Sequence, residues 1–215
     1  MKIKFFALFL VMLFIPLFAC NNLSEQRSSV SQIRYNIFYG EENGIKIKVF
    51  SEEKEYPFIN DGIANSRQNF VIVKVLNQYN DTNINLSYNG QNYNAKCQYN
   101  AHSNSMDYSF KVKSLPNKEV TVVANTNDTS VSITCKSLLK SDTISPLTAL
   151  EKVNKAQSEF ISTLYQNGEF KAEIYVRLIV ESDYNFYYVG FGQGANKITA
   201  FLIDGITGEI LAGKN

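Results

Sequence analysis

The chain has 215 residues, of which 45% are hydrophobic, and it carries 21 basic and 20 acidic side chains, one histidine and three cysteines. This near-balanced charge excludes the strongly basic face that nucleic-acid binding requires. Zinc needs three or four nitrogen and sulfur ligands, and one histidine with two cysteines that a disulfide could join cannot supply them, so we expect no metal.

The first 20 residues have the layout of a secretory signal peptide. Two lysines precede an apolar run from Phe5 to Ile15, and a proline and a small-residue site follow. The run is shorter than the roughly 20 residues that a membrane-spanning helix needs, so we predict a signal peptide over residues 1–19. The final four residues, LFAC, resemble the lipobox of bacterial lipoproteins. This resemblance implies that Cys20 is acylated and that the chain is anchored on the extracytoplasmic face of the cell membrane.

The cysteine count fits this interpretation, because a secreted chain with three cysteines has one left over. Acylation would account for Cys20. Cys97 and Cys135 then remain, and both lie in segments with strand patterns. One expectation is a disulfide between them in an oxidising compartment, and the alternative is two buried thiols that pack as small hydrophobes.

Residues 20–31 are mostly polar and lack periodicity, so we predict a lipidated flexible tether there. Residues 32–140 contain seven or eight short strand patterns, such as the alternating GIKIKVF and the nearly continuous apolar run NFVIVKVLN. Asn89-Gly90 is typical of a type I′ hairpin turn. With no amphipathic helix before residue 140, this region predicts an immunoglobulin-like antiparallel β-sandwich.

The pattern changes at residue 145, where a second unit over residues 145–215 is predicted. Ser145 can cap a helix with a proline at its first position, and apolar residues at helical spacing continue to a stop at Asn167-Gly168. An alternating strand from Phe170 to Val180 follows, and its polar face carries Tyr175 and Arg177. The chain is therefore predicted to be mainly β and then α+β.

Gly190, Gly192 and Ala195 match the G-x-G-x-x-A fingerprint of a dinucleotide-binding turn. That fingerprint must open a helix whose N-terminus holds the pyrophosphate. The next segment, KITAFLID, is rich in β-branched and aromatic residues and is too short for such a helix. We therefore predict that these glycines join two strands as a hairpin loop and that the chain binds no cofactor.

The end of the chain, DGITGEIL, resembles the terminal D-x-x-T-G-E-[IV]-L hairpin of the PepSY domain. Gly208 can supply the special backbone angle, and Asp204 and Thr207 can hydrogen-bond the turn. The resemblance covers residues 146–213, and the whole chain resembles lipoproteins of Gram-positive bacteria with a β-rich domain in front. It implies a PepSY/cystatin-like unit of one helix on an antiparallel sheet and a role in binding a peptide or regulating a peptidase. It supplies no catalytic residues.

The function expected from these patterns is binding and not catalysis. His102, in the polar loop AHSNS, has no carboxylate or cysteine at ligand spacing. On the free sheet face, Tyr175 and Arg177 are the expected contact residues, because these residue types dominate binding hot spots. The alternative is a structural envelope protein that packs in a membrane-associated complex. An exposed edge strand beside a groove would favour the first hypothesis, and a large apolar patch between the units the second.

The lipobox generates the first testable prediction, that Cys20→Ala releases the protein from the membrane or mislocalises it. The substitution removes the only atom to which the lipid can be attached. Cell fractionation, with mass spectrometry of the mature N-terminus, measures the effect. Recovery from wild-type cells of a soluble protein with an unmodified N-terminus downstream of residue 20 would contradict the prediction.

Overall fold

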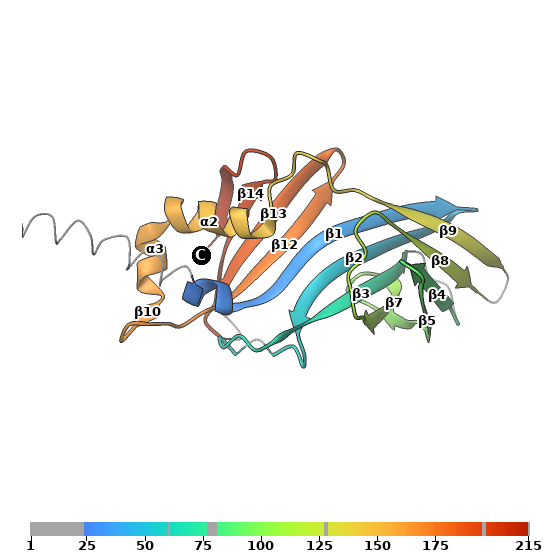
Figure 1. The fold of residues 1–215 in the computed structure, drawn as a ribbon, viewed down its shortest axis with the longest axis horizontal. Coiled ribbons are helices and arrows are strands. Elements are labelled where there is room, and N and C mark those ends of the chain that lie inside the picture. Colours follow the sequence, from blue (N-terminus) through green and yellow to red (C-terminus); the bar gives the residue numbers. More distant parts are fainter. Residues whose placement is uncertain (1–23, 60, 77–80, 127–128, 195–196, 215) are drawn as a thin grey trace, which may run out of the picture.

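The computed structural model describes residues 24–59, 61–76, 81–126, 129–194 and 197–214. Within these ranges the chain is mainly β, as predicted, and thirteen of its strands form one curled, mostly antiparallel sheet (Figure 1). The predicted signal peptide and Cys20 lie outside the described residues. The strands of the sheet are β1 (Val30–Glu42), β2 (Ile45–Glu55), β3 (Arg67–Leu76), β4 (Asn83–Tyr88), β5 (Gln91–Lys96), β6 (Gln98–Asn100), β7 (Ser105–Lys111), β8 (Glu119–Asn125), β9 (Ser130–Ser137), β12 (Glu173–Glu181), β13 (Tyr184–Gly192), β14 (Ile198–Asp204) and β15 (Ile210–Lys214).

The long strand β1 belongs to both halves of the molecule. Its first part pairs in parallel with β12, where Ile33 lies opposite Val176, and most of its length pairs antiparallel with β2. Its far end also pairs with β9 through Phe38 and Tyr39. The strand order is β15-β14-β13-β12-β1-β2-β3-β7-β6, with β9, β8, β4 and β5 branching from β1. The predicted units at 32–140 and 145–215 are therefore parts of one continuous sheet.

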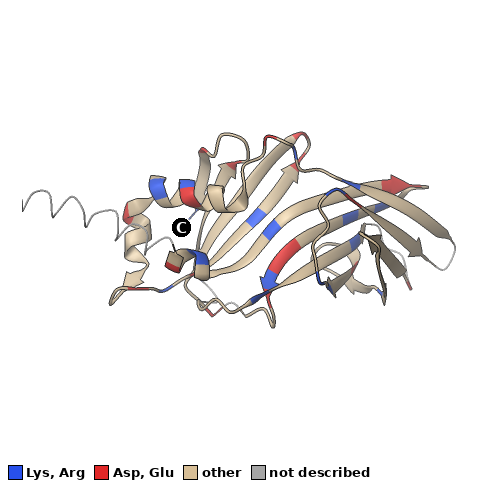
Figure 2. Ribbon diagram, in the orientation of Figure 1, with Lys and Arg blue, Asp and Glu red and all other residues tan. Residues whose placement is uncertain are grey.

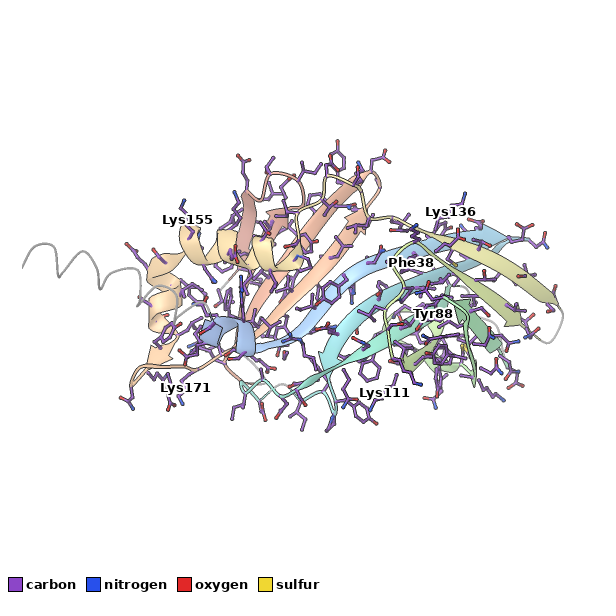
Figure 3. All side chains as sticks on the ribbon, in the orientation of Figure 1. Phe38, Tyr88, Lys111, Lys136, Lys155 and Lys171 are labelled. Atoms are coloured by element: carbon purple, nitrogen blue, oxygen red, sulfur yellow. The ribbon has the colours of Figure 1, made fainter. Side chains whose placement is uncertain are left out.

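The β-rich half encloses its own core. Inward-facing side chains of β1, β2, β3 and β7 meet those of β4, β8 and β9, and Phe38 and Tyr88, labelled in Figure 3, belong to this cluster. The strand patterns recognised in this half all form strands. The turn prediction at Asn89-Gly90 is also confirmed, because both residues have positive φ angles, 47° and 71°, between β4 and β5. The strands and the turn of this half are therefore specified locally, by the alternation of apolar and polar residues and by the residue types at the turn.

Two short helices cover one face of the C-terminal strands. Helix α2 (Pro146–Ala156) packs on β12 and β13, and α3 (Ser158–Thr163) follows it. The predicted cap is confirmed, because the Thr148 amide donates to the Ser145 hydroxyl at 3.1 Å. The prediction of one helix up to Asn167-Gly168 is wrong. Helix α2 ends at Ala156. Asn167-Gly168 forms the turn between β10 (Tyr165–Gln166) and β11 (Glu169–Phe170).

The glycine-rich segment joins two antiparallel strands, as predicted, but Gly190 and Gly192 lie within strand β13 and not in the loop, and Ala195 lies outside the described residues. The segment after Gly192 leads from β13 into the antiparallel strand β14, so the glycines do not open a helix. At the last hairpin the Asp204 carboxylate accepts hydrogen bonds from the amides of Ile206 and Thr207 at 2.9 and 2.7 Å. Gly208 has a φ of +73°, which a side chain would disfavour.

The segment predicted as a flexible tether is ordered from residue 24 onward. Residues 24–28 are helical, and the side chain of Gln26 is buried against the C-terminal unit, where it accepts a hydrogen bond from Asn154. Arg27 forms an ion pair with Glu151 at 2.7 Å, and the Glu25 carboxylate accepts the amide of Phe170. These contacts fix the start of the described chain onto the helical face. Among the described residues, no helix is both long and apolar enough to cross a bilayer.

Cys97 and Cys135 are buried free thiols in the core of the β-rich half, where a disulfide was one of the two expectations. Burial raises the pKa of both thiols to about 12, and for Cys97 the negative charge of Asp107 adds to the effect. The thiolate is the reactive form of cysteine. Both side chains are therefore protected from alkylation, because reagents in solution cannot reach them and because few of them are ionised.

This burial predicts that iodoacetamide at pH 8 leaves both thiols unmodified in the folded protein. At four pH units below the pKa, only about one molecule in 10,000 carries the thiolate at either site. In 6 M guanidinium without reductant, both should be alkylated, as intact mass spectrometry of the full-length protein would show. Alkylation in guanidinium that requires prior reduction would instead establish a disulfide.

Candidate functional site

Charged side chains run across the middle of the sheet, on the face opposite the helices. Apolar Ile174, Val176 and Leu178 of β12 pack in the helical core, so Arg177 points to the other face. Arg177 lies opposite Arg34 of β1, and Arg34 lies opposite Glu52 of β2. Figure 2 shows blue and red segments close together on neighbouring strands in the middle of the sheet.

A groove of about 1000 Å³ lies above this row. Its floor comes from β12, β1, β2, β3 and β7, and its rim includes the turn between β6 and β7. Charged, polar and aromatic side chains share the lining, which is a mixture typical of ligand sites. The lining residues are Gln32, Arg34, Phe50, Glu52, Lys54, Phe58, Ile72, Lys74, Gln98, Tyr99, Asn100, Ala101, His102, Asp107, Tyr108, Ser109 and Arg177.

Glu52 is the centre of the polar network on the groove floor. Only 1% of its surface is exposed. It accepts hydrogen bonds from Gln32 Nε2 at 3.0 Å and Arg34 Nε at 3.4 Å, and the Lys54 ammonium lies 3.6 Å from its other oxygen. A carboxylate this buried requires such partners, because an isolated charge would be strongly destabilising.

The two arginines differ in how they are held. Arg34 lies with its guanidinium 4.5 Å from the centre of the Phe50 ring. Burial lowers the pKa of Arg34, the Glu52 charge opposes this shift, and the Arg177 charge adds to it. Arg177 donates from Nε to Gln32 Oε1 at 2.6 Å and lies 5.2 Å from the Tyr175 ring and 5.7 Å from the Tyr188 ring. Within the described ranges it forms no ion pair with a carboxylate.

The far wall of the groove carries a separate, balanced pair. Lys74 Nζ lies 2.9 Å from the Asp107 carboxylate, which also accepts the Ser105 hydroxyl at 2.5 Å. His102 is exposed on the rim, in the polar turn where the sequence places it, and its amide donates to Asn100 Oδ1. This wall therefore adds polar groups to the groove but no net charge.

Segment 57–66, of which residue 60 is not described, covers part of the same sheet face through its residues 57–59 and 61–66, which corrects the predicted contact surface. Phe58 lies against Tyr175, with ring centroids 6.1 Å apart, and the Gly62 amide donates to the buried Glu173 carboxylate at 3.1 Å. The Asn65 amide donates to the equally buried Glu55 at 2.8 Å. Tyr175 is consequently 2% exposed and is no accessible anchor. Its pKa is raised by burial and, secondly, by its hydrogen bond to Glu173.

Of the two predicted contact residues, the structure thus places Arg177 in the groove and Tyr175 beneath a covering segment. The sequence reasoning missed Arg34, Glu52 and Gln32. Their polar character at alternating positions was a usable signal, but it did not reveal that β1 pairs with β12. No group of three or more His, Cys, Asp or Glu side chains within the described ranges is arranged to hold a metal ion.

Comparison with known proteins identifies no relative of this chain. No protein-family model, curated protein or solved structure matches the chain.

Proposed function

We propose that this protein is a membrane-anchored extracytoplasmic lipoprotein that acts as a binding module for a peptide or a peptidase, with the groove as its ligand surface. The observation that carries the proposal is the groove itself, about 1000 Å³ in volume and lined by both charged and aromatic side chains. Pockets of this size and composition are the usual places where proteins hold ligands.

The edge of the sheet supports a binding role over a purely structural one. Strand β15 ends the strand order, and four of its five residues are exposed. A second groove of about 440 Å³ runs beside it, lined by β13, β14 and β15 and including Tyr188, Leu202 and Ala212. An exposed edge strand beside a groove can accept an extended peptide by strand addition.

The proposed anchor would hold this surface close to the membrane. Four residue steps separate Cys20 from Ser24, the first described residue of a helix, and a chain of that length spans at most about 14 Å. That helix is fixed to the C-terminal unit by Gln26 and Arg27. A lipid on Cys20 would therefore hold the C-terminal unit near the bilayer surface.

We also propose finer identities for the two halves. The layers around the β-rich core support an immunoglobulin-like arrangement for residues 32–140. Helix α2 on β12 and β13, together with the Asp204 turn, supports a PepSY-like unit for residues 145–215. The peptidase-regulating role follows only from that second resemblance.

The proposed function predicts that filling the groove abolishes ligand capture. A photo-crosslinking residue at Tyr99, on the rim, should give adducts in native membranes, whereas one at the equally exposed Tyr184 should not. Ile72→Trp/Ser109→Trp, at positions that face each other across β3 and β7, should reduce the adduct yield at position 99 about tenfold or more, equivalent to about 1.4 kcal/mol of binding free energy.

The matched control for this experiment is Ile63→Trp/Ser141→Trp. Both positions are exposed and neither lines the groove. The control should keep the wild-type adduct yield, and thermal melting should show that both double variants are folded. Equal adducts from positions 99 and 184, or adducts that survive the groove-filling variant, would contradict the proposed function.

A further inference from the structure

The arrangement of Arg34 and Arg177 is energetically unusual without a ligand. The two residues are direct neighbours across the parallel pair β1 and β12. Like charges placed side by side on neighbouring strands repel each other. Together with Lys54 they form a group of three cations around one carboxylate, Glu52, which leaves a net charge of +2 on this part of the floor.

Four other charged side chains lie near this group. Lys74 and Asp107 neutralise each other on the far wall. Glu173 and Glu55 lie under segment 57–66, where both carboxylates accept backbone amides of that segment. Glu173 and Glu55 lower the charge of the sheet face as a whole, but they do not line the groove, whose own lining keeps the excess of the three cations over Glu52.

Arg177 also retains unused hydrogen-bond donors. Its Nε is bonded to Gln32, but within the described ranges neither of its terminal nitrogens has a hydrogen-bond partner. Tyr175 and Tyr188 lie within 6 Å of its guanidinium and orient it, as Phe50 does for Arg34. Arg34 donates from Nε to Glu52 and from Nη1 to the Leu178 carbonyl at 3.5 Å, so Arg177 can offer an oxyanion a two-donor fork and Arg34 adds its remaining N–H groups beside it.

We propose that Arg34 and Arg177 bind the carboxylate or phosphate group of an anionic ligand, and that the apolar part of this ligand lies along the groove wall formed by Phe50, Phe58 and Ile72. This inference rests on the groove being a ligand site and names the chemical class of its ligand. Glu52 and Gln32 position the two guanidinium groups and do not contact the oxyanion. An oxyanion there would replace the repulsion between the arginines with two charge-assisted contacts.

The test uses the full-length protein in a nonionic detergent and follows the side-chain Nε–H signals of its arginines by NMR. Three probes share one ring and differ in their polar group: phenylacetate, phenyl phosphate and the neutral phenylacetamide. We expect the signals of Arg34 and Arg177 to shift saturably with at least one of the two anions, more weakly at high salt, and to stay unchanged with phenylacetamide. Whichever anion binds more tightly identifies the oxyanion.

Substitutions locate the site. Arg177→Gln should weaken anion binding about tenfold or more, because it removes one charge-assisted fork. Arg177→Lys, which keeps the charge and loses the fork, should have an intermediate effect. Arg27→Gln removes an exposed arginine on the helical face and should bind like the wild-type protein. If Arg177→Gln alters the overall spectrum, Arg34→Gln provides the same test from the neighbouring strand.

Several outcomes would overturn the inference. They are an absence of binding by both anions, equal binding by phenylacetamide, and an equal loss of affinity in the Arg27→Gln control. Equal binding of the neutral probe would leave the groove as a ligand site and remove only its anion specificity. Failure of the crosslinking experiment with intact anion binding would instead reject the broader function, so the two failures are distinguishable.

Discussion

Backbone pairing between β1 and β12 is the constraint on which the rest of this structure depends. The early residues of β1, including Ile33 and Ile37, pack in the core beneath the helices, and Phe38 packs in the core of the β-rich half. One strand therefore takes part in two hydrophobic cores. Because it is also hydrogen-bonded to β2, β9 and β12, the two halves cannot rotate freely against each other. Their relative orientation is fixed by ladder hydrogen bonds, which a flexible linker between domains would not provide.

The groove is a direct result of this shared strand. Side chains on the helix-free face alternate with those that fill the two cores, so the same register that buries Val176 exposes Arg177. The sheet brings that arginine beside Arg34 and Glu52, which lie on consecutive strands far from it in the sequence. A buried carboxylate and two adjacent guanidinium groups contribute little to folding stability compared with apolar side chains of similar size. Such a row is easier to explain as a binding surface than as a device for stability.

Local features of the fold were predictable because they depend on a few neighbouring residues. Strand alternation, the Asn89-Gly90 turn, the Ser145 cap and the Asp204 hairpin all belong to this class. The parallel pairing of β1 with β12 was not predictable, because its partners are about 140 residues apart and no local pattern specifies them. For the same reason the sequence did not reveal that segment 57–66 covers Tyr175, or that Arg34 lies beside Arg177. Half of the predicted contact pair therefore proved to be buried.

The most direct test of this account is the measurement of NMR nuclear Overhauser effects between β1 and β12 in the full-length protein. The account predicts backbone cross-peaks that join Ile33 to Val176 and Arg34 to Arg177, in the pattern of parallel strands. Clear cross-peaks between β1 and β2 together with none between β1 and β12 would contradict it. In that case the halves would be separate, and the two arginines would not form a common site.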